Sequence, residues 1–217
     1  MFLEKDNRLS LARIAIGAMV MVLIVLAGVF WFDVPVYDFL RGFDFSVWRY
    51  IGAVFGVRGW VILSASVVVA FYIRKTIQMH EKFRFRNVYS RVKNSYAFWV
   101  FCSVFGASMV AAILKFVIGR ARPVLYGMYG VPSFVPFANS WAFHSMPSGH
   151  AVASFAGLVM IGMLAPRARW FCWAFATIVG VSRVCAGFHW PSDVILGAFI
   201  GILMADAAKS FLSRRAK

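Results

Sequence analysis

Long uncharged apolar stretches alternate with short polar segments along the whole chain. Residues 14–32 and 95–114 form runs of 19 and 20 residues without a charge, and a helix that crosses a bilayer needs roughly 20. Four further stretches are shorter, at residues 59–73, 148–165, 170–182 and 194–205. We expect all six to be transmembrane helices, and we expect the helix at residues 59–73 to begin earlier, near Tyr50. In the last stretch, Gly197 and Gly201 form a small-residue pattern that lets helices approach closely.

This pattern predicts an all-α protein, an integral membrane bundle of six transmembrane helices in which residues 1–217 form a single domain. The composition agrees, since 62% of the residues are hydrophobic and 14% are charged, against about 25% charged in soluble domains. A disordered chain is poor in apolar residues, so that class is excluded. The three cysteines lie in or beside apolar stretches and are interpreted as buried apolar residues.

The net charge of +15 comes from 23 basic and 8 acidic residues. In so apolar a chain it indicates cytoplasmic loops and not a nucleic-acid partner. With six spans, 16 of the 23 basic residues fall on the side of the two termini, many of them in residues 74–93. Both termini are therefore predicted to be cytoplasmic, in a multi-pass protein of the cytoplasmic (inner) membrane. Residues 14–32 exceed the roughly 7–15 apolar residues of a signal peptide, so we expect an uncleaved first span.

Polar residues form three clusters that are unusual for an apolar bundle. Lys115 and Arg122 are seven positions apart, about two helical turns, so they share a face if the helix persists. Pro123 disfavours helix at Arg122, so the span is expected to end there. The second cluster, Ser148-Gly149-His150 after a proline, opens a span, where free backbone N–H groups and the helix dipole suit an anion.

The third cluster contains Arg183, His189 and Asp193. His189 and Asp193 are i and i+4, so one helical turn can bring the carboxylate onto the imidazole. The predicted topology puts all three clusters at the extracytoplasmic ends of their spans.

The clusters bring together three cations with one nearby acid, which implies an anionic ligand with several oxygens. Phosphate fits best, since arginine binds it bidentately and lysine as a point charge. A histidine held by an aspartate suggests a nucleophile or base, and a second histidine a general acid. A zinc site of His150, His189 and Asp193 is the alternative, but the surrounding cations would repel a metal. Four other arginines are interpreted as interfacial anchors: Arg41, Arg49, Arg58 and Arg120.

The three motifs read Lys-x6-Arg-Pro, Pro-Ser-Gly-His and Ser-Arg-x5-His-x3-Asp, at residues 115–123, 147–150 and 182–193. Together they resemble the signature of the type 2 phosphatidic acid phosphatases, which bacterial acid phosphatases and vanadium haloperoxidases share. The resemblance implies that His189 attacks phosphorus and forms a phosphohistidine, that Asp193 orients it, and that His150 protonates the leaving group and then activates water. It also implies that the phosphoryl oxygens are bound by Lys115, Arg122, Ser148, Gly149 and Arg183, and that the reaction needs no cofactor or metal.

The expected function is therefore a membrane lipid phosphatase with its active site at the extracytoplasmic face and a lipid phosphate as substrate. Polyprenyl diphosphate, phosphatidylglycerol phosphate, phosphatidic acid and lipid A phosphate are all candidates. A lipid-to-lipid phosphotransferase with the same site, or a non-catalytic lipid-binding or transport protein, are the alternatives. Four aromatic residues between the first two motifs either receive lipid chains or form an interfacial belt: Phe134, Phe137, Trp141 and Phe143. The oligomeric state stays open.

Overall fold

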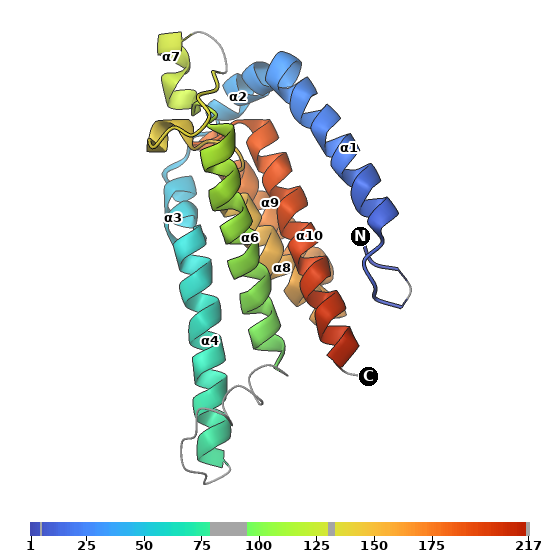
Figure 1. The fold of residues 1–217 in the computed structure, drawn as a ribbon. Coiled ribbons are helices and arrows are strands. Elements are labelled where there is room, and N and C mark those ends of the chain that lie inside the picture. Colours follow the sequence, from blue (N-terminus) through green and yellow to red (C-terminus); the bar gives the residue numbers. More distant parts are fainter. Residues whose placement is uncertain (5, 79–94, 130–132, 216–217) are drawn as a thin grey trace.

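The computed structural model describes the chain except residues 5, 79–94, 130–132 and 216–217, and shows it as a bundle of helices (Figure 1). The described residues contain helices and no strand, as the apolar stretches predict. Most of the basic segment 74–93, which contributes to the predicted orientation, lies outside the described residues.

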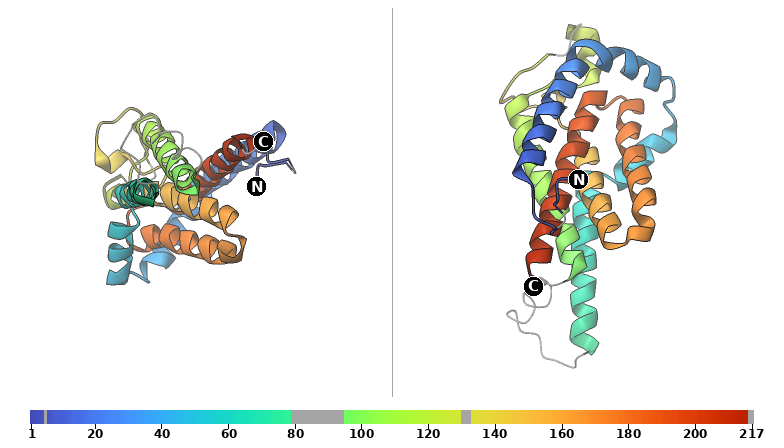
Figure 2. Two further views of the ribbon diagram at one scale, coloured as in Figure 1. Left: turned by 90° about the horizontal axis from the view of Figure 1, so that it is seen from below. Right: turned by 90° about the vertical axis from the view of Figure 1, so that its right-hand side faces the viewer.

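The amino-terminal part is a long helix that bends into a shorter one. Helix α1 (Leu11–Ala27) continues through a π-helical turn (Gly28–Phe32) into α2 (Asp33–Arg41). None of the residues of α1 is buried, and the helix lies at the periphery of the bundle beside α10 (Figure 2). An apolar helix exposed along its length is suited to contact with lipid.

A second pair of helices follows, and here the expected boundary was wrong. Tyr50 lies in a separate short helix, α3 (Ser46–Val54), and the long helix α4 (Val57–Gln78) begins only after it. The break falls at Phe55, whose φ of −97° and ψ of 24° leave the helical region. Gly56 then leads into α4. This junction between α3 and α4 turns out to form one wall of a cavity.

The carboxy-terminal half contains the four helices that carry the motifs. These are α6 (Tyr96–Ile118), α8 (Gly149–Leu164), α9 (Arg169–Cys185) and α10 (Pro191–Arg215). Ser95 caps α6 by accepting a hydrogen bond from the Phe98 N–H at 3.1 Å. Proline is well tolerated at the first position of α10 because that N–H has no partner within the helix.

Helix α8 is the centre of the bundle, because 12 of its 16 residues are buried. Helices α6, α9 and α10 pack around it (Figure 1). A Cβ on Gly201 would lie 2.6 Å from the Val152 carbonyl oxygen, and one on Gly197 would lie 2.8 Å from that of Ser148. The predicted close approach through Gly197 and Gly201 is therefore confirmed, and α8 is the helix that they meet.

Four helices of the described residues are long and apolar enough to cross a membrane: Leu11–Arg41, Val57–Ile77, Tyr96–Ile118 and Pro191–Arg214. Helix α8, with 16 residues, is about 24 Å long at 1.5 Å per residue, and α9 has 17 residues. The structure thus shows an all-helical protein with at least four candidate spans. Figure 1 shows the loop between α6 and α8 at the end of the bundle away from the C-terminus.

Candidate active site

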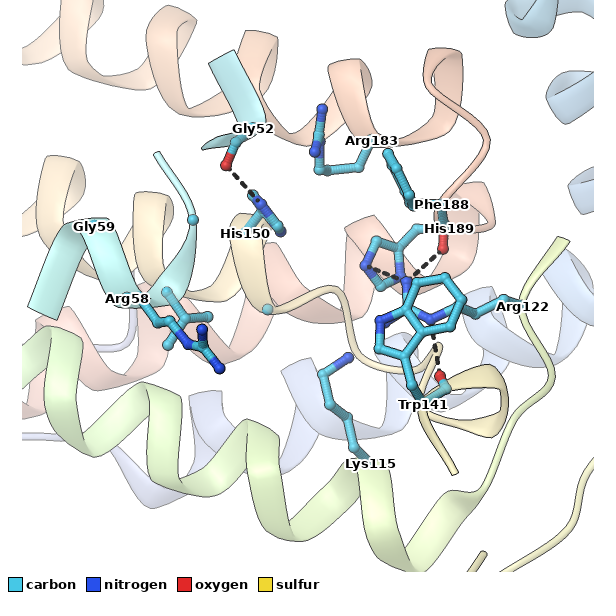
Figure 3. Close-up of a pocket in the computed structure, with 13 residues that line it drawn as sticks. Gly52, Arg58, Gly59, Lys115, Arg122, Trp141, His150, Arg183, Phe188 and His189 are labelled. Atoms are coloured by element: carbon cyan, nitrogen blue, oxygen red, sulfur yellow. Dashed lines mark hydrogen bonds between the residues drawn. The ribbon is translucent and has the colours of Figure 1, made fainter. Parts of the chain in front are cut away.

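The three motifs meet at one cavity of about 420 Å³ (Figure 3). Six residues expected to form the site line it: Lys115, Arg122, Gly149, His150, Arg183 and His189. The other two, Ser148 and Asp193, are fully buried and do not line it. The opposite wall comes from the junction between α3 and α4, through Gly52, Gly56 and Arg58. We call this space the motif cavity.

The first motif spans a helix end. Helix α6 stops at Ile118, and Gly119 follows with a φ of 60°, a left-handed conformation that glycine adopts without strain. Arg122 is therefore on an extended loop, and the two cations do not share a helix face. Lys115 Nζ donates to the His144 carbonyl at 2.8 Å, and Arg122 donates to the Trp141 and His144 carbonyls at 3.0 and 3.2 Å. These carbonyls bring both cations to the cavity.

The second motif opens α8 beneath the cavity. The Ser148 N–H donates to the Asp193 carbonyl at 2.9 Å, while its buried hydroxyl oxygen has no hydrogen-bond partner among the described residues. A Cβ on Gly149 would lie 2.9 Å from Val57 Cγ2, so this position suits glycine. His150 Nε2 lies 3.0 Å from the Gly52 carbonyl oxygen. Since a carbonyl only accepts, this nitrogen carries a proton.

The third motif supplies the cavity with a cation, Arg183, and with the second histidine, His189. Arg183 is 3% exposed; its Nε donates to Ser182 Oγ at 3.3 Å and its Nη2 donates to the Trp48 carbonyl. His189 Nε2 lies 3.5 Å from Arg122 Nη1, and its Nδ1 lies 3.6 Å from Asp193 Oδ2. An arginine only donates and a carboxylate only accepts. These neighbours therefore favour the tautomer with a proton on Nδ1 and a lone pair on Nε2, at the cavity.

Burial keeps this imidazole neutral. His189 is 2% exposed, and burial lowers its pKa to about 3, with Lys115 and Arg122 acting in the same direction and Asp193 in the opposite one. Burial also lowers the pKa of Arg122 to about 10, so this guanidinium stays charged near neutral pH. The site therefore combines a neutral nitrogen base with a positive surrounding.

The charge around the motif cavity is one-sided. Four of the described residues that line it are cations, namely Arg58, Lys115, Arg122 and Arg183, and none is acidic. A Trp141 ring also lines the cavity, with its centroid 4.1 Å from Arg122 Cζ. Such a space attracts an anion, and the mixture of arginine forks with a lysine matches the oxygens of a phosphoryl group.

A model of the PAP2 superfamily matches residues 96–217, which contain all three motifs. The chain belongs to this superfamily. Among curated relatives, the lipid A 1-phosphatase of Rhizobium johnstonii is 36% identical over 151 residues, which are 68% of this chain and 59% of that protein. The undecaprenyl-diphosphatase of Sulfolobus acidocaldarius is 41% identical over 59 residues, which are 27% of this chain and 29% of that one.

The chain thus spans about three fifths of the length of the lipid A 1-phosphatases of Rhizobium that it matches. Among solved structures, LpxE of Aquifex aeolicus matches with a TM-score of 0.51 and 18% sequence identity, over 83% of this chain and 96% of that one. At this identity the likeness concerns the fold alone, and it agrees with the helical bundle.

The structure corrects the interpretation of Arg120, which was expected to be an interfacial anchor. It is fully buried, and its guanidinium forms ion pairs with Asp33 and Asp193, each at 2.6 Å. Asp193 is therefore the partner of Arg120 and does not face the cavity cations directly. The superfamily motifs do not contain Asp33. The sequence feature that could have revealed Asp33 is its position directly after an apolar stretch, because an acidic side chain there is costly unless it is paired.

The other expected anchors differ from one another. Arg58 is exposed but lines the motif cavity, so it belongs to the candidate site. Arg41 donates to Asp44 and to the Cys185 carbonyl, each at 2.8 Å. Arg49 is 72% exposed, and its Nη2 lies 4.0 Å from Asp44 Oδ2.

The four aromatic residues before the second motif do not form one surface. Trp141 belongs to the motif cavity, whereas Phe134 lines a separate apolar groove of about 480 Å³ between α1 and the helices α6 and α10. Phe137 packs on Phe116, with ring centroids 5.5 Å apart. Of these four residues, only Trp141 lines the motif cavity.

Proposed function

We propose that the chain is an integral membrane phosphatase that hydrolyses a phosphate monoester or diphosphate on a lipid. The observation that carries this proposal is that two histidines and three cations from three separate motifs line one cavity without an acidic neighbour among the described lining residues. This is the arrangement that a phosphoryl group requires, because its transition state spreads negative charge over the equatorial oxygens.

In the proposed reaction His189 Nε2 attacks phosphorus, and the bond to the leaving oxygen breaks. Nδ1 faces Asp193 at 3.6 Å, so the carboxylate stabilises the positive charge that develops on the ring. The contact is longer than a hydrogen bond and is expected to tighten when substrate binds, as catalytic contacts often do. In this step His150 acts as an imidazolium: it gives one proton to the leaving oxygen and becomes neutral, then takes a proton from the water that hydrolyses the phosphohistidine, which releases phosphate and regenerates His189.

The cations supply the electrostatic part of the reaction. Lys115, Arg122 and Arg183 come from three different segments and reach the same cavity (Figure 3). The Gly149 backbone and the first N–H groups of α8 offer further donors to the phosphoryl oxygens. Preorganised donors of this kind are often the largest contribution to catalysis. In this mechanism the arginines and the lysine do the work that Mg²⁺ does in other phosphoryl transfers.

The proposal includes six transmembrane segments, with both termini in the cytoplasm and the motif cavity at the extracytoplasmic face. The distribution of Lys and Arg supports this orientation. Within the described part of the chain, four helices have the length and apolarity of spans, and α8 and α9 would be the two short ones. In this arrangement α8 is surrounded by other helices, which agrees with its burial.

The names of the relatives select the first substrates to test. These are lipid A 1-phosphate, from the relatives called lipid A 1-phosphatase, and undecaprenyl diphosphate, from the relative called undecaprenyl-diphosphatase. Phosphatidic acid and phosphatidylglycerol phosphate complete the panel. All of them present a phosphoryl group at the membrane surface.

The test is phosphate release by detergent-purified protein on this panel, with His189→Ala in parallel. The expected result is release by the wild type and none by the variant. Phosphate label that appears on a second lipid, in place of free phosphate, would assign phosphotransfer. No reaction with any lipid would contradict the proposed enzymatic function and favour a binding or transport role.

A further inference from the structure

A buried charge cluster lies directly behind the motif cavity. Arg120 is at its centre, with Nη2 2.6 Å from Asp33 Oδ2 and Nη1 2.6 Å from Asp193 Oδ1. Ser192 joins Arg120 to Asp33, since its hydroxyl accepts from Arg120 at 2.7 Å and donates to Asp33 at 2.6 Å. Its N–H also donates to Asp33 Oδ1 at 2.8 Å. Every charged member of the cluster is at most 1% exposed.

Asp33 is the member that comes from elsewhere in the chain. It begins α2, well before residues 96–217, which the PAP2 model matches. Arg120, Ser192 and Asp193 all lie inside the match. The amino-terminal helices are thus tied to the residue that faces His189. A carboxylate so deeply buried is costly to place, and here it is held by three short contacts.

The geometry points to Asp33 as a positioning residue for the proposed reaction: it holds Arg120, and through Arg120 it sets the place and the effective charge of the Asp193 carboxylate. This inference rests on the proposed function, because it concerns the step in which His189 attacks phosphorus. Asp33 is not among the residues that line the motif cavity, so it acts through Asp193 and does not touch the substrate.

The charge balance explains why a second carboxylate is useful. One guanidinium shared by two carboxylates leaves one negative charge in the cluster. That charge favours the positive imidazole formed when Nε2 bonds to phosphorus. Without Asp33, the whole charge of Arg120 would act on Asp193, and the cluster would be neutral. The effect is strong because charges interact more strongly in a buried environment than in water.

The contacts of Asp193 show the positioning part of the role. Its Oδ2 accepts from Ser145 Oγ at 2.5 Å and from the Trp190 N–H at 2.9 Å, and it lies 3.6 Å from His189 Nδ1. Arg120 occupies the other oxygen and so prevents rotation of the carboxylate. Loss of Asp33 frees Arg120 to move, and the orientation of Asp193 becomes less defined.

The experiment compares Asp33→Asn with Asp38→Asn, a change of the same type at an exposed position of the same helix. Both are purified in detergent and assayed with the panel lipid that the wild type hydrolyses. For Asp33→Asn, kcat is expected to fall about 10- to 100-fold, because small displacements of catalytic groups have effects of this size. KM is expected to stay within about twofold of the wild-type value. Rapid-quench trapping of the phosphohistidine should show slower formation. Asp38→Asn should match the wild type in both measurements.

An unchanged kcat in folded Asp33→Asn would overturn the inference, as would a rise of KM with kcat intact. If Asp33→Asn does not fold, Ser192→Ala is judged by the same criteria, since it removes the hydroxyl that joins Arg120 to Asp33 and keeps every charge. Failure of both variants to fold would overturn the positioning role in favour of a purely structural one. Failure of the proposed function looks different, because wild type and Asp38→Asn would then release no phosphate either.

Discussion

Replacement of Gly52 by alanine would separate stability from activity. Gly52 lies in α3, and the atoms nearest to a Cβ at this position belong to the guanidinium of Arg183. Those atoms are the mobile end of a long side chain, so the arginine is expected to move and the backbone to stay. The move takes Arg183 away from the Trp48 carbonyl to which it donates and from its place in the motif cavity.

Two opposing effects have different sizes. Alanine is favoured over glycine inside a helix by about 1 kcal/mol, which offsets part of the lost hydrogen bond between Arg183 and Trp48, so the folded protein should be at most about 2 kcal/mol less stable than the wild type. The loss of a hydrogen bond to a charged group amounts to about 1.5–3 kcal/mol. If Arg183 binds the phosphoryl group in the transition state, kcat/KM should fall about 10- to 150-fold, at 1.36 kcal/mol per factor of ten.

The measurement is kcat/KM with the best lipid of the panel, together with the thermal midpoint in detergent. Gly127→Ala is the matched control, because it lies in the short helix α7 (Tyr126–Tyr129) and a Cβ there would meet no atom within 4 Å. Vanadate, which resembles the transition state, should inhibit Gly52→Ala more weakly than Gly127→Ala. Equal kcat/KM for Gly52→Ala and the wild type would refute the role of Arg183 in phosphate binding.

Three further predictions concern the same site. Because the pKa of folded His189 is about 3 and that of an unfolded histidine about 6.5, the unfolded chain takes up a proton first as the pH falls. The wild type should therefore lose stability relative to His189→Gln by about 1.4 kcal/mol per pH unit between these values, and parallel thermal midpoints from pH 6 to pH 4 would contradict this. Arg58→Ala should raise KM for a lipid diphosphate about fivefold, as an exposed ion pair is worth up to about 1 kcal/mol, and leave KM for a monophosphate unchanged; equal effects on both would exclude a contact with the second phosphate. Phosphate release should survive EDTA, and loss that zinc or Mg²⁺ restores would refute the metal-free mechanism.

The motifs allowed much of the site to be predicted, since each of them gives spacing and chemistry together. His189 and Asp193 were expected to be neighbours from their i, i+4 spacing, and the structure has them 3.6 Å apart. Lys115 and Arg122 were expected to share one helix face. They instead line the same cavity from the helix and from the loop that follows it. The left-handed Gly119 ends the helix between them. A glycine in an apolar run does not reveal whether it continues a helix or ends it.

Charge alone did not distinguish the arginines, because their environment depends on contacts between distant segments. Arg120 and Arg122 are two positions apart in the sequence, and both residues are buried. Arg122 turns to the cavity, while Arg120 turns to a carboxylate 87 residues earlier in the chain. A pattern of positions within one segment contains no information on such a partner.

The part of the chain before the family match therefore contributes more to the site than its lack of motifs indicated. It supplies Asp33 behind the cavity, and Gly52, Gly56 and Arg58 along one wall. His150 Nε2 donates to the Gly52 carbonyl on this wall, so the proposed general acid faces the wall, and we expect the leaving group to lie on that side. In the proposed mechanism, phosphoryl transfer would then depend on residues 96–217 together with Asp33, whereas the choice among leaving groups would depend on the junction between α3 and α4. Exchange of residues 52–59 between two superfamily members should change lipid preference and leave the phosphohistidine step intact.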